Sequence, residues 1–298
     1  MTLGQKIKEA RIERKMTQRD VVGDYITRNM LSKIENDSAT PSVKTLEHIA
    51  KVLNLPAGYF MSDLTTDDGE PSGITGARKA YKAGNYPAAL DMINAVDLAK
   101  TSHEDEACLL HAKCCTGIAE QAYHDGDVTR ARACARDALK HNAAGLYFDL
   151  RCELVCCEIL MLCAIQLESQ SEYRQYEKRY LAESSKGNIA ESFSIIQALF
   201  VSGRDGLATG LKLLENIHAE NISDPWVRAM YMLLSARAKI EAGDIDGAIK
   251  LLETAEIEAG KNGGKLIKSE IYSYLERCHK AKDNFRMAYH YATLRLEI

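Results

Sequence analysis

The sequence has few prolines and aromatic residues, and it contains no apolar run long enough to span a membrane. Five prolines and one tryptophan occur in 298 residues, and aromatic residues make up 7%. Apolar residues reach 46%, which argues against long disordered tracts. The longest apolar run, 154–167, is interrupted by Glu158 and is shorter than a transmembrane helix. The N-terminus also lacks the apolar segment of a secretion signal. We therefore expect a cytoplasmic protein that does not associate with membranes.

The motifs of common enzymes and metal sites are absent as well. No H-E-x-x-H, P-loop or G-x-G-x-x-G occurs, so the sequence argues against an enzyme. Histidines 103, 111, 124 and 141 show no recognisable ligand spacing with acidic partners, and we expect neither a metal nor another cofactor. The nine cysteines include no C-x-x-C motif, and Cys152, Cys156 and Cys163 have the spacing of one buried helix face. Core filling is the favoured interpretation, with redox sensing and metal binding as alternatives.

The stretch from Thr17 to Pro41 predicts two short helices joined by a tight turn. Thr17 is placed to cap the first helix, and Asp20 complements the free amides of its first turn. Gly23 and Asp24 break the pattern, and a second helix begins at Thr27. The second helix has three apolar residues on its predicted inner face: Met30, Leu31 and Ile34. Its other side carries four polar residues: Arg28, Asn29, Ser32 and Lys33. A helix pair of this kind has the shape that enters a DNA major groove.

Further helices are predicted on both sides of this pair. The segment from Leu3 to Lys15 is amphipathic, with an apolar face of Leu3, Ile7 and Ala10. After Pro41, Ser42 is a predicted cap and Pro56 a stop for another helix. The apolar stripe of that helix consists of Val43, Leu46, Ile49, Ala50 and Leu53. With a short helix at 57–64, residues 1–64 form a predicted all-α domain of five helices.

This segment resembles the phage-repressor (Cro and XRE) class of helix-turn-helix domains. The resemblance extends over roughly Leu3 to Leu64 and includes the T-Q opening, the I-E-N after the second helix and the following T-P-S. It implies that Arg11 of the first helix pairs with Glu35 at the end of the recognition helix, in a structural role. The chain departs from the family at the turn, which is one residue shorter and places Gly23 early.

The charge distribution also favours the N-terminal part as the partner of a polyanion. Residues 1–64 contain ten Lys and Arg against eight Asp and Glu, a balance of +2, whereas the remainder has 28 against 34, or −6. Six basic residues are available for a DNA-facing surface: Lys6, Arg14, Lys15, Arg28, Lys33 and Lys44. A merely solvated surface is the alternative.

A DNA contact can be assigned to each polar residue of the motif. Gln18 would position the domain on a phosphate or a base edge. Four residues would read bases, with Arg preferring guanine and Asn preferring adenine: Arg28, Asn29, Ser32 and Lys33. Thr40 and Lys44 would contact phosphates. Two copies on half-sites about 34 Å apart, or a multiple, are the expected arrangement on double-stranded DNA.

The rest of the chain predicts a linker at 65–75 and a helical repeat domain at 76–298. A helix, a G-D-Y-like turn and a following alanine recur at Gly84, Gly126 and Gly243. Weaker copies begin at Ser171, Gly203 and Asp283. Small residues lie where paired helices should cross: Ala119, Ala131, Ala138, Ala236, Ala248 and Ala255. The pattern resembles the tetratricopeptide repeat, which implies an α-solenoid of stacked helix pairs.

In that repeat class, the residue after the small residue of each first helix points into a concave groove. Copied through the array, the position falls on Arg78, Glu120, Ile165, Gln197, Arg237 and Arg277. The last three form a polar and basic run that we expect to hold a carboxylate or peptide backbone of an effector. Ordinary solvated residues on amphipathic helices are the alternative interpretation.

The combined architecture resembles the peptide-pheromone-responsive regulators of Gram-positive bacteria. The resemblance implies a transcription regulator whose repeats bind a short peptide. Because one DNA-binding domain of this size has limited affinity, we also expect a homodimer whose contact is made by the repeat domain. The competing hypothesis is a helical-repeat interaction scaffold that does not bind DNA sequence-specifically. These two hypotheses differ in whether the chain enriches any sequence from a random DNA pool.

Overall fold

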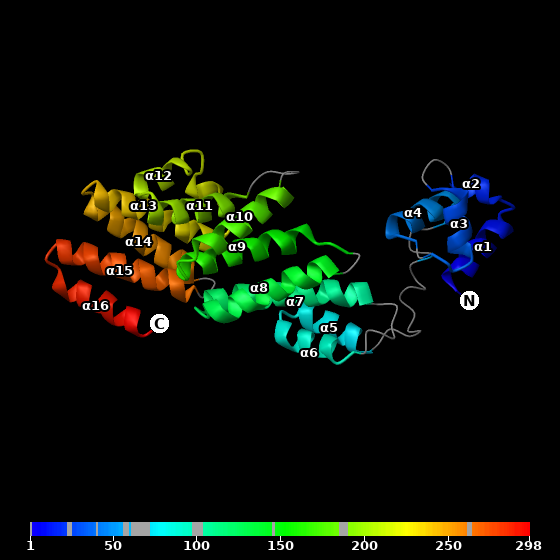
Figure 1. The fold of residues 1–298 in the computed structure, drawn as a ribbon, viewed down its shortest axis with the longest axis horizontal. Coiled ribbons are helices and arrows are strands. Elements are labelled where there is room, and N and C mark those ends of the chain that lie inside the picture. Colours follow the sequence, from blue (N-terminus) through cyan, green and yellow to red (C-terminus); the bar gives the residue numbers. More distant parts are fainter. Residues whose placement is uncertain are drawn as a thin grey trace. The chain divides into compact units, whose positions relative to one another are not determined.

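The protein is described here from a computed structural model, in which the chain forms two compact units, Met1–Glu70 and Pro71–Ile298. The structure describes residues 2–22, 26–39, 41–55, 60, 72–96, 104–144, 147–184, 190–260 and 264–298. Every regular element in these ranges is helical, which confirms the all-α prediction (Figure 1). None of the described helices is both long and apolar enough to cross a membrane.

The N-terminal unit packs four described helices around one core. These are α1 (Leu3–Glu13), α2 (Gln18–Val22), α3 (Arg28–Glu35) and α4 (Val43–Val52). Ile7, Leu31 and Ile49 are among the side chains that fill the core. The predicted turn residues Gly23 and Asp24 lie outside the described residues, as does most of the predicted helix at 57–64, of which only the buried Phe60 is described.

The predicted helix caps are present. The backbone N–H of Thr17 donates to Oδ2 of Asp20 at 2.7 Å, and the N–H of Asp20 donates to Oγ1 of Thr17 at 3.3 Å, which is a reciprocal capping arrangement. Thr27 accepts from the Met30 N–H at the start of α3. Ser42 caps α4 in the same way. Side-chain oxygens therefore bind amides that would otherwise lack partners in the first turns.

Helix α1 approaches α3 closely enough to require a glycine. A Cβ at Gly4 would lie 2.2 Å from the carbonyl oxygen of Ile34. The carboxylate of Asp37, just after α3, accepts from the Gly4 N–H at 3.0 Å and from the Thr2 hydroxyl at 2.5 Å. Asp37 thus anchors the N-terminus of α1 to the end of α3.

The predicted inner face of α3 is wrong at one position. Leu31 and Ile34 are buried, but 39% of Met30 is exposed. Successive residues of a helix are rotated by about 100°. The buried residues of α3 are Leu31, Ile34 and Glu35. The inner face is centred on these three residues, and Met30 lies at its edge.

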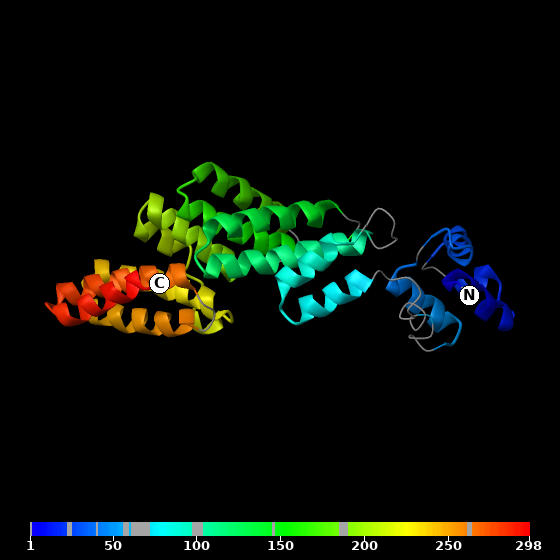
Figure 2. The ribbon, with the colours of Figure 1, turned by 90° about the horizontal axis from the view of Figure 1, so that it is seen from below.

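The C-terminal unit consists of six helix pairs in the described residues, stacked in chain order (Figure 1, Figure 2). The first two pairs are α5 (Ser72–Lys82) with α6 (Tyr86–Asn94) and α7 (Glu104–His124) with α8 (Val128–Ala144). The next two are α9 (Leu150–Gln166) with α10 (Gln170–Ser184) and α11 (Glu191–Arg204) with α12 (Leu207–Lys212). After the 3-10 helix η3 (Ala219–Asn221) come α13 (Pro225–Glu241) with α14 (Ile245–Gly260) and α15 (Lys265–Ala281) with α16 (Phe285–Leu296). Helix α5 begins within the predicted linker.

The turns between paired helices follow one rule. A residue with positive φ precedes each second helix: Gly84, Gly126, Glu168, Gly206, Gly243 and Asp283. The fourth residue of that helix then lies at the crossing: Ala89, Ala131, Tyr173, Gly210, Ala248 and Ala288. The predicted alanines at these crossings are confirmed as fully buried, including Ala119, Ala138, Ala236 and Ala255.

The third and fourth predicted copies are each placed three residues from their turns. Ser171 and Gly203 lie inside helices, whereas the turn residues are Glu168 and Gly206. Tyr173 occupies the position that is alanine in the strong copies, and it stacks on Phe200 with ring centroids 3.6 Å apart. The prediction thus interpreted Tyr173, which lies at a helix crossing, as the aromatic residue of a turn.

Candidate nucleic-acid interface and inner groove

A buried polar network fixes the orientation of α3 in the N-terminal unit. Arg11 donates from Nε to Oε1 of Glu35 at 2.6 Å and from a terminal nitrogen to Oε2 at 2.9 Å. Gln18 Nε2 donates to the same Oε2 at 2.8 Å. Burial raises the pKa of Glu35, but the hydrogen bonds from Arg11 and Gln18 outweigh this effect and hold it below its ordinary value. The predicted Arg11–Glu35 pair is therefore present. Gln18, which was predicted to contact a phosphate or a base edge, is half-buried and uses its amide nitrogen in this network.

The exposed side of α3 carries most of the predicted base-reading residues. Arg28, Asn29 and Lys33 are exposed, and Ser32 is half-buried. Asn29, Ser32 and Lys33 lie on the side of the helix away from Ile34, and Arg28 is exposed in the first turn. Lys44 is exposed in the first turn of α4. Thr40, the other predicted phosphate contact, lies outside the described residues. Exposed cationic and amide donors on one helix suit contact with phosphates and base edges.

The repeat unit contains a groove made of three connected cavities along the first helices of its pairs. A cavity of about 310 Å³ between α7, α9 and α11 lies at the centre. It shares Glu120, Arg151 and Val155 with a cavity of about 220 Å³ toward α5. It shares Tyr123, Leu162 and Trp226 with a cavity of about 190 Å³ that reaches α15. First helices thus line a continuous inner surface, as the repeat resemblance implies.

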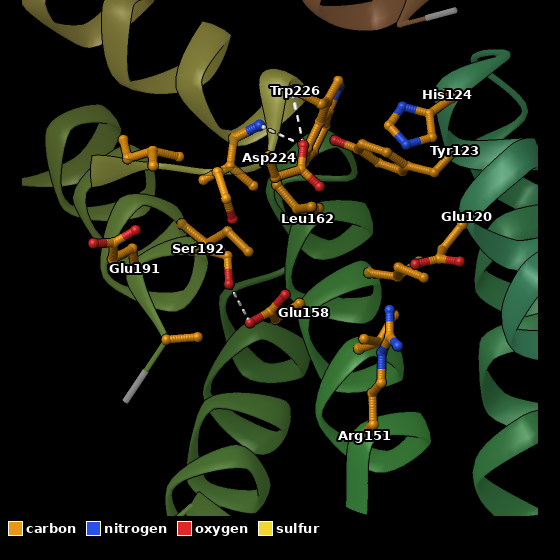
Figure 3. A pocket seen from close by; sticks show the side chains of 17 residues that line it. Glu120, Tyr123, His124, Arg151, Glu158, Leu162, Glu191, Ser192, Asp224 and Trp226 are labelled. Carbon is orange, nitrogen blue, oxygen red and sulfur yellow. Dashed lines mark hydrogen bonds between the residues drawn. The ribbon is translucent and has the colours of Figure 1, made fainter. Parts of the chain in front are cut away.

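The central cavity is acidic (Figure 3). Four carboxylate residues line it: Glu120, Glu158, Glu191 and Asp224. Arg151 reaches into the same space from α9 and is the one arginine of the lining. Asp224 also caps α13, since its carboxylate accepts from the Trp226 N–H at 2.8 Å. The excess of carboxylates makes this cavity suited to a cation.

Burial changes the protonation of the groups in this cavity. It raises the pKa of Glu158 to about 7, although the hydroxyl of Ser192 donates to Oε1 of Glu158 at 2.7 Å and acts in the opposite direction. Burial also raises the pKa of Glu120. Burial lowers the pKa of His124, so the imidazole is neutral at pH 7. Glu158 therefore titrates near neutrality and would ionise more fully beside a bound cation.

Aromatic rings form one wall of the cavity. Trp226 meets Tyr123 edge to face with ring centroids 5.8 Å apart, and His124 with centroids 5.0 Å apart. Figure 3 shows Trp226, Tyr123 and His124 gathered at one end, above Glu120 and Glu158. A cation in this space would meet both carboxylates and aromatic faces. Trp226 is the single tryptophan of the chain, and its fluorescence reports on this site.

The structure separates the three predicted effector residues. Gln197 Nε2 donates to Glu177 Oε1 at 3.0 Å, toward α10. Arg237 lines the cavity that reaches α15 and also lies over Tyr274, with 5.8 Å to the ring centroid. Arg277 lies 5.2 Å from the same centroid. Tyr274 therefore brings the two arginines together, and Gln197 is not part of their group.

The other predicted groove positions have mixed outcomes. Glu120 lines the groove as expected, and Arg78 forms an ion pair with Glu106 of α7. Ile165 lines one cavity, but Leu162, three residues earlier, lines two. This difference of three residues is the same as the error in the predicted position of the third turn. The prediction missed the acidic cavity, although one signal existed: Glu158 interrupts the apolar run 154–167.

Comparison with known proteins identifies the N-terminal unit. Residues 4–63 match a family model described as a helix-turn-helix domain. The immunity repressor protein of Bacillus phage phi105 is 38% identical over 66 residues, which cover 22% of this chain and 46% of the repressor. The chain thus spans less than half of that relative. The N-terminal unit is a helix-turn-helix domain similar to that of a phage repressor.

Several solved structures are similar over much of the chain at low identity. PlcR of Bacillus thuringiensis, in complex with the peptide PapR7 and DNA, is 17% identical with a TM-score of 0.31, covering 99% of this chain and 94% of PlcR. The pheromone receptor Rgg2 of Streptococcus dysgalactiae is 13% identical with a TM-score of 0.29, covering 72% and 93%. ComR of S. thermophilus, with DNA and its signalling peptide ComS, is 14% identical with a TM-score of 0.28, covering 99% of each chain. Such values do not establish a shared function.

Proposed function

We propose that this protein is a transcription regulator that binds double-stranded DNA sequence-specifically through α3. One observation carries the proposal: Arg28, Asn29 and Lys33 are exposed on α3, and the buried Arg11–Glu35 pair fixes the orientation of this helix. A rigid helix that presents these donors can keep a constant register against base edges. Lys44 supplies a phosphate contact, and Thr40 and Ser32 remain proposed contacts.

Selection from a random duplex pool tests this proposal. We expect enrichment of a defined sequence. Arg28→Ala or Asn29→Ala should each reduce discrimination at one base position by about 1–3 kcal/mol. Lys51→Ala, which removes an exposed charge from the last turn of α4, is the matched control and should leave the preferred sequence unchanged. Failure of the folded chain to enrich any sequence, with or without cell extract, would favour the interaction scaffold instead.

We propose further that the protein binds DNA as a homodimer whose contact is made by the repeat unit. A domain of this size contacts only one half-site, so two copies on an inverted repeat would read about 34 Å of DNA or a multiple of it. Sedimentation of the full chain should show a dimer. The enriched sequence should also contain two related halves. A monomer bound to an asymmetric site would contradict this part of the proposal.

The inner groove is the proposed effector site, and its charges define the effector chemistry. The central cavity would take a positively charged group, such as the amino terminus or a lysine side chain of a peptide, between Glu120, Glu158 and the Trp226 ring. Arg237, in the neighbouring cavity, would bind a carboxylate or backbone carbonyl further along the same peptide. The effector is therefore an extended peptide with a cationic residue.

Trp226 fluorescence can test this site directly. Short lysine-containing peptides should change the emission saturably, and acetylation of the lysine should weaken binding at least tenfold because it removes the charge. Glu158→Gln should have a similar effect, whereas Glu183→Gln, an exposed carboxylate of α10, is the control. Equal binding of acetylated and free peptides would refute the cationic effector.

Arg237→Ala combined with Arg277→Ala should weaken the peptide response. An unchanged response and an unchanged dimer would remove these arginines from the proposal.

A further inference from the structure

The second helix pair carries metal-ligand residues on its facing helices. His111 and Cys115 lie one turn apart on α7, and Asp137 and His141 lie one turn apart on α8. Packing of α7 on α8 brings the two pairs together. We propose that His111, Asp137 and His141, with Cys115 as a fourth ligand, bind a divalent transition-metal ion, with Zn²⁺ as the preferred ion.

The distances between donor atoms support this site. One ligand atom each from His111, Asp137 and His141 lies within 4.8 Å of the others. Sγ of Cys115 is 3.5 Å from Nδ1 of His111 and 3.5 Å from Oδ2 of Asp137. A tetrahedral Zn²⁺ ion with bonds of about 2.0 Å to nitrogen or oxygen and about 2.3 Å to sulfur places neighbouring ligand atoms about 3.5 Å apart. Because a metal ion lies in the plane of each imidazole that binds it, rotation of the His111 and His141 side chains would complete the coordination.

The imidazole rings are held in place by contacts typical of metal-binding histidines. Nδ1 of His141 is 3.0 Å from the carbonyl oxygen of Asp137. When Nδ1 donates this hydrogen bond, Nε2 keeps its lone pair for a metal ion. The rings of His111 and His141 stack with centroids 3.7 Å apart. Both histidines thus face the same region between α7 and α8.

A cavity provides access to the proposed site. Its volume is about 180 Å³, and His111 and His141 form part of its lining. Ile93, Asn94 and Val96, at the end of α6, line the other side. A bound ion would join α7 to α8 next to the preceding helix pair. It should therefore stabilise the start of the repeat array.

Titration of the metal-free full chain with Co²⁺ tests this inference. We expect about one equivalent to bind, with a thiolate-to-cobalt band in the near ultraviolet, and Zn²⁺ to displace it. Excess Zn²⁺ should raise the melting temperature by roughly 5 °C. Asp137→Asn and His141→Gln should each weaken binding at least tenfold. Cys115→Ser should remove the thiolate band, and His290→Gln, an exposed histidine of α16, should change nothing.

Three results would overturn the proposed metal site. The first is an absence of saturable binding to the folded wild-type chain. The second is wild-type affinity in both Asp137→Asn and His141→Gln. The third is a Co²⁺ spectrum without a thiolate band, which would refute the proposed ligand set because that set includes Cys115. Because the wild-type spectrum identifies the sulfur ligand without any substitution, the proposal stays testable even if one variant fails to fold. These outcomes do not depend on DNA or effector binding.

Discussion

The two units hold their functional surfaces in place by different physical means. In the N-terminal unit, α3 is oriented by a buried ion pair, since Glu35 is almost completely buried against Arg11. In the repeat unit, helices cross at small or stacked side chains such as Ala131, Gly210 and Tyr173. An ion pair is lost entirely when one partner is removed, whereas packing is distributed over many contacts. The N-terminal unit should therefore be the more sensitive to a single polar substitution.

Glu35→Ala should have the largest effect on stability. It leaves Arg11 without its buried carboxylate, and we expect the N-terminal unit to lose about 3–5 kcal/mol of unfolding free energy. Far-UV circular dichroism in urea reports on both units. Trp226 fluorescence reports only on the repeat unit, and its transition should not move.

Glu47→Ala is the matched control for this experiment, because Glu47 is an exposed carboxylate of α4. It should change the free energy of unfolding by less than about 0.5 kcal/mol. If Glu35→Ala has an equally small effect, the ion pair does not hold α3, and the contrast between the two units disappears.

Ala131→Leu tests the repeat unit at a helix crossing. Ala131 is fully buried between α7 and α8, and the added side chain must displace one of the two helices. We expect a loss of up to about 3 kcal/mol, measured by urea unfolding with Trp226 fluorescence. Ala133→Leu, an exposed position of α8, is the control. Equal stability of the two variants would show that the crossing tolerates a large residue, as it does at Tyr173.

The stability of the repeat unit should vary with pH because of Glu158. Burial raises the pKa of Glu158 to about 7 in the folded chain, against an ordinary value of 4.5. Between these values the unfolded chain releases the proton and the folded chain keeps it, so stability falls as the pH rises and levels off above 7. Glu158→Gln should raise the free energy of unfolding by about 2 kcal/mol at pH 8 and by little at pH 4. The same pH slope in both proteins would contradict this assignment.

Thr17→Ala should have the smallest effect. It removes the hydroxyl that accepts from the Asp20 N–H at the start of α2. A lost cap of this kind typically costs about 1 kcal/mol. The change is expected in the same N-terminal transition that Glu35→Ala affects, as seen by circular dichroism. Thr129→Ala, at an exposed position of α8 in the repeat unit, is a control of the same chemistry and should not shift this transition.

The residues of the helix-turn-helix motif were largely predictable because their interactions are short in sequence or belong to a specific pattern. The caps at Thr17 and Ser42 connect residues three apart, and the Arg11–Glu35 pair followed from the family resemblance. The prediction placed Met30 on the inner face of α3 because it did not count Glu35 among the buried residues. Glu35 is buried because it pairs with Arg11, which lies on another helix.

The phase of the repeats was harder to predict because one structural position accepts different residues. The crossing position is alanine in the strong copies, glycine at Gly210 and tyrosine at Tyr173. Gly210 is required there because a Cβ would lie 2.6 Å from the backbone carbonyl oxygen of Ala198. Tyr173 fits because Phe200 supplies a stacking partner. Each choice depends on the neighbouring helix, which the local pattern does not specify.

The all-α class, the helix-turn-helix domain and the alternation of paired helices follow from the amino-acid sequence, because periodicity, caps and turn residues act over a few residues. The side chains that meet between helices depend on tertiary packing. It placed the carboxylates of Glu120, Glu158 and Asp224 around one cavity, and it joined the His111 and Cys115 pair to the Asp137 and His141 pair. These contacts depend on the rotation of each helix about its axis, which is fixed by packing against neighbours distant in the chain.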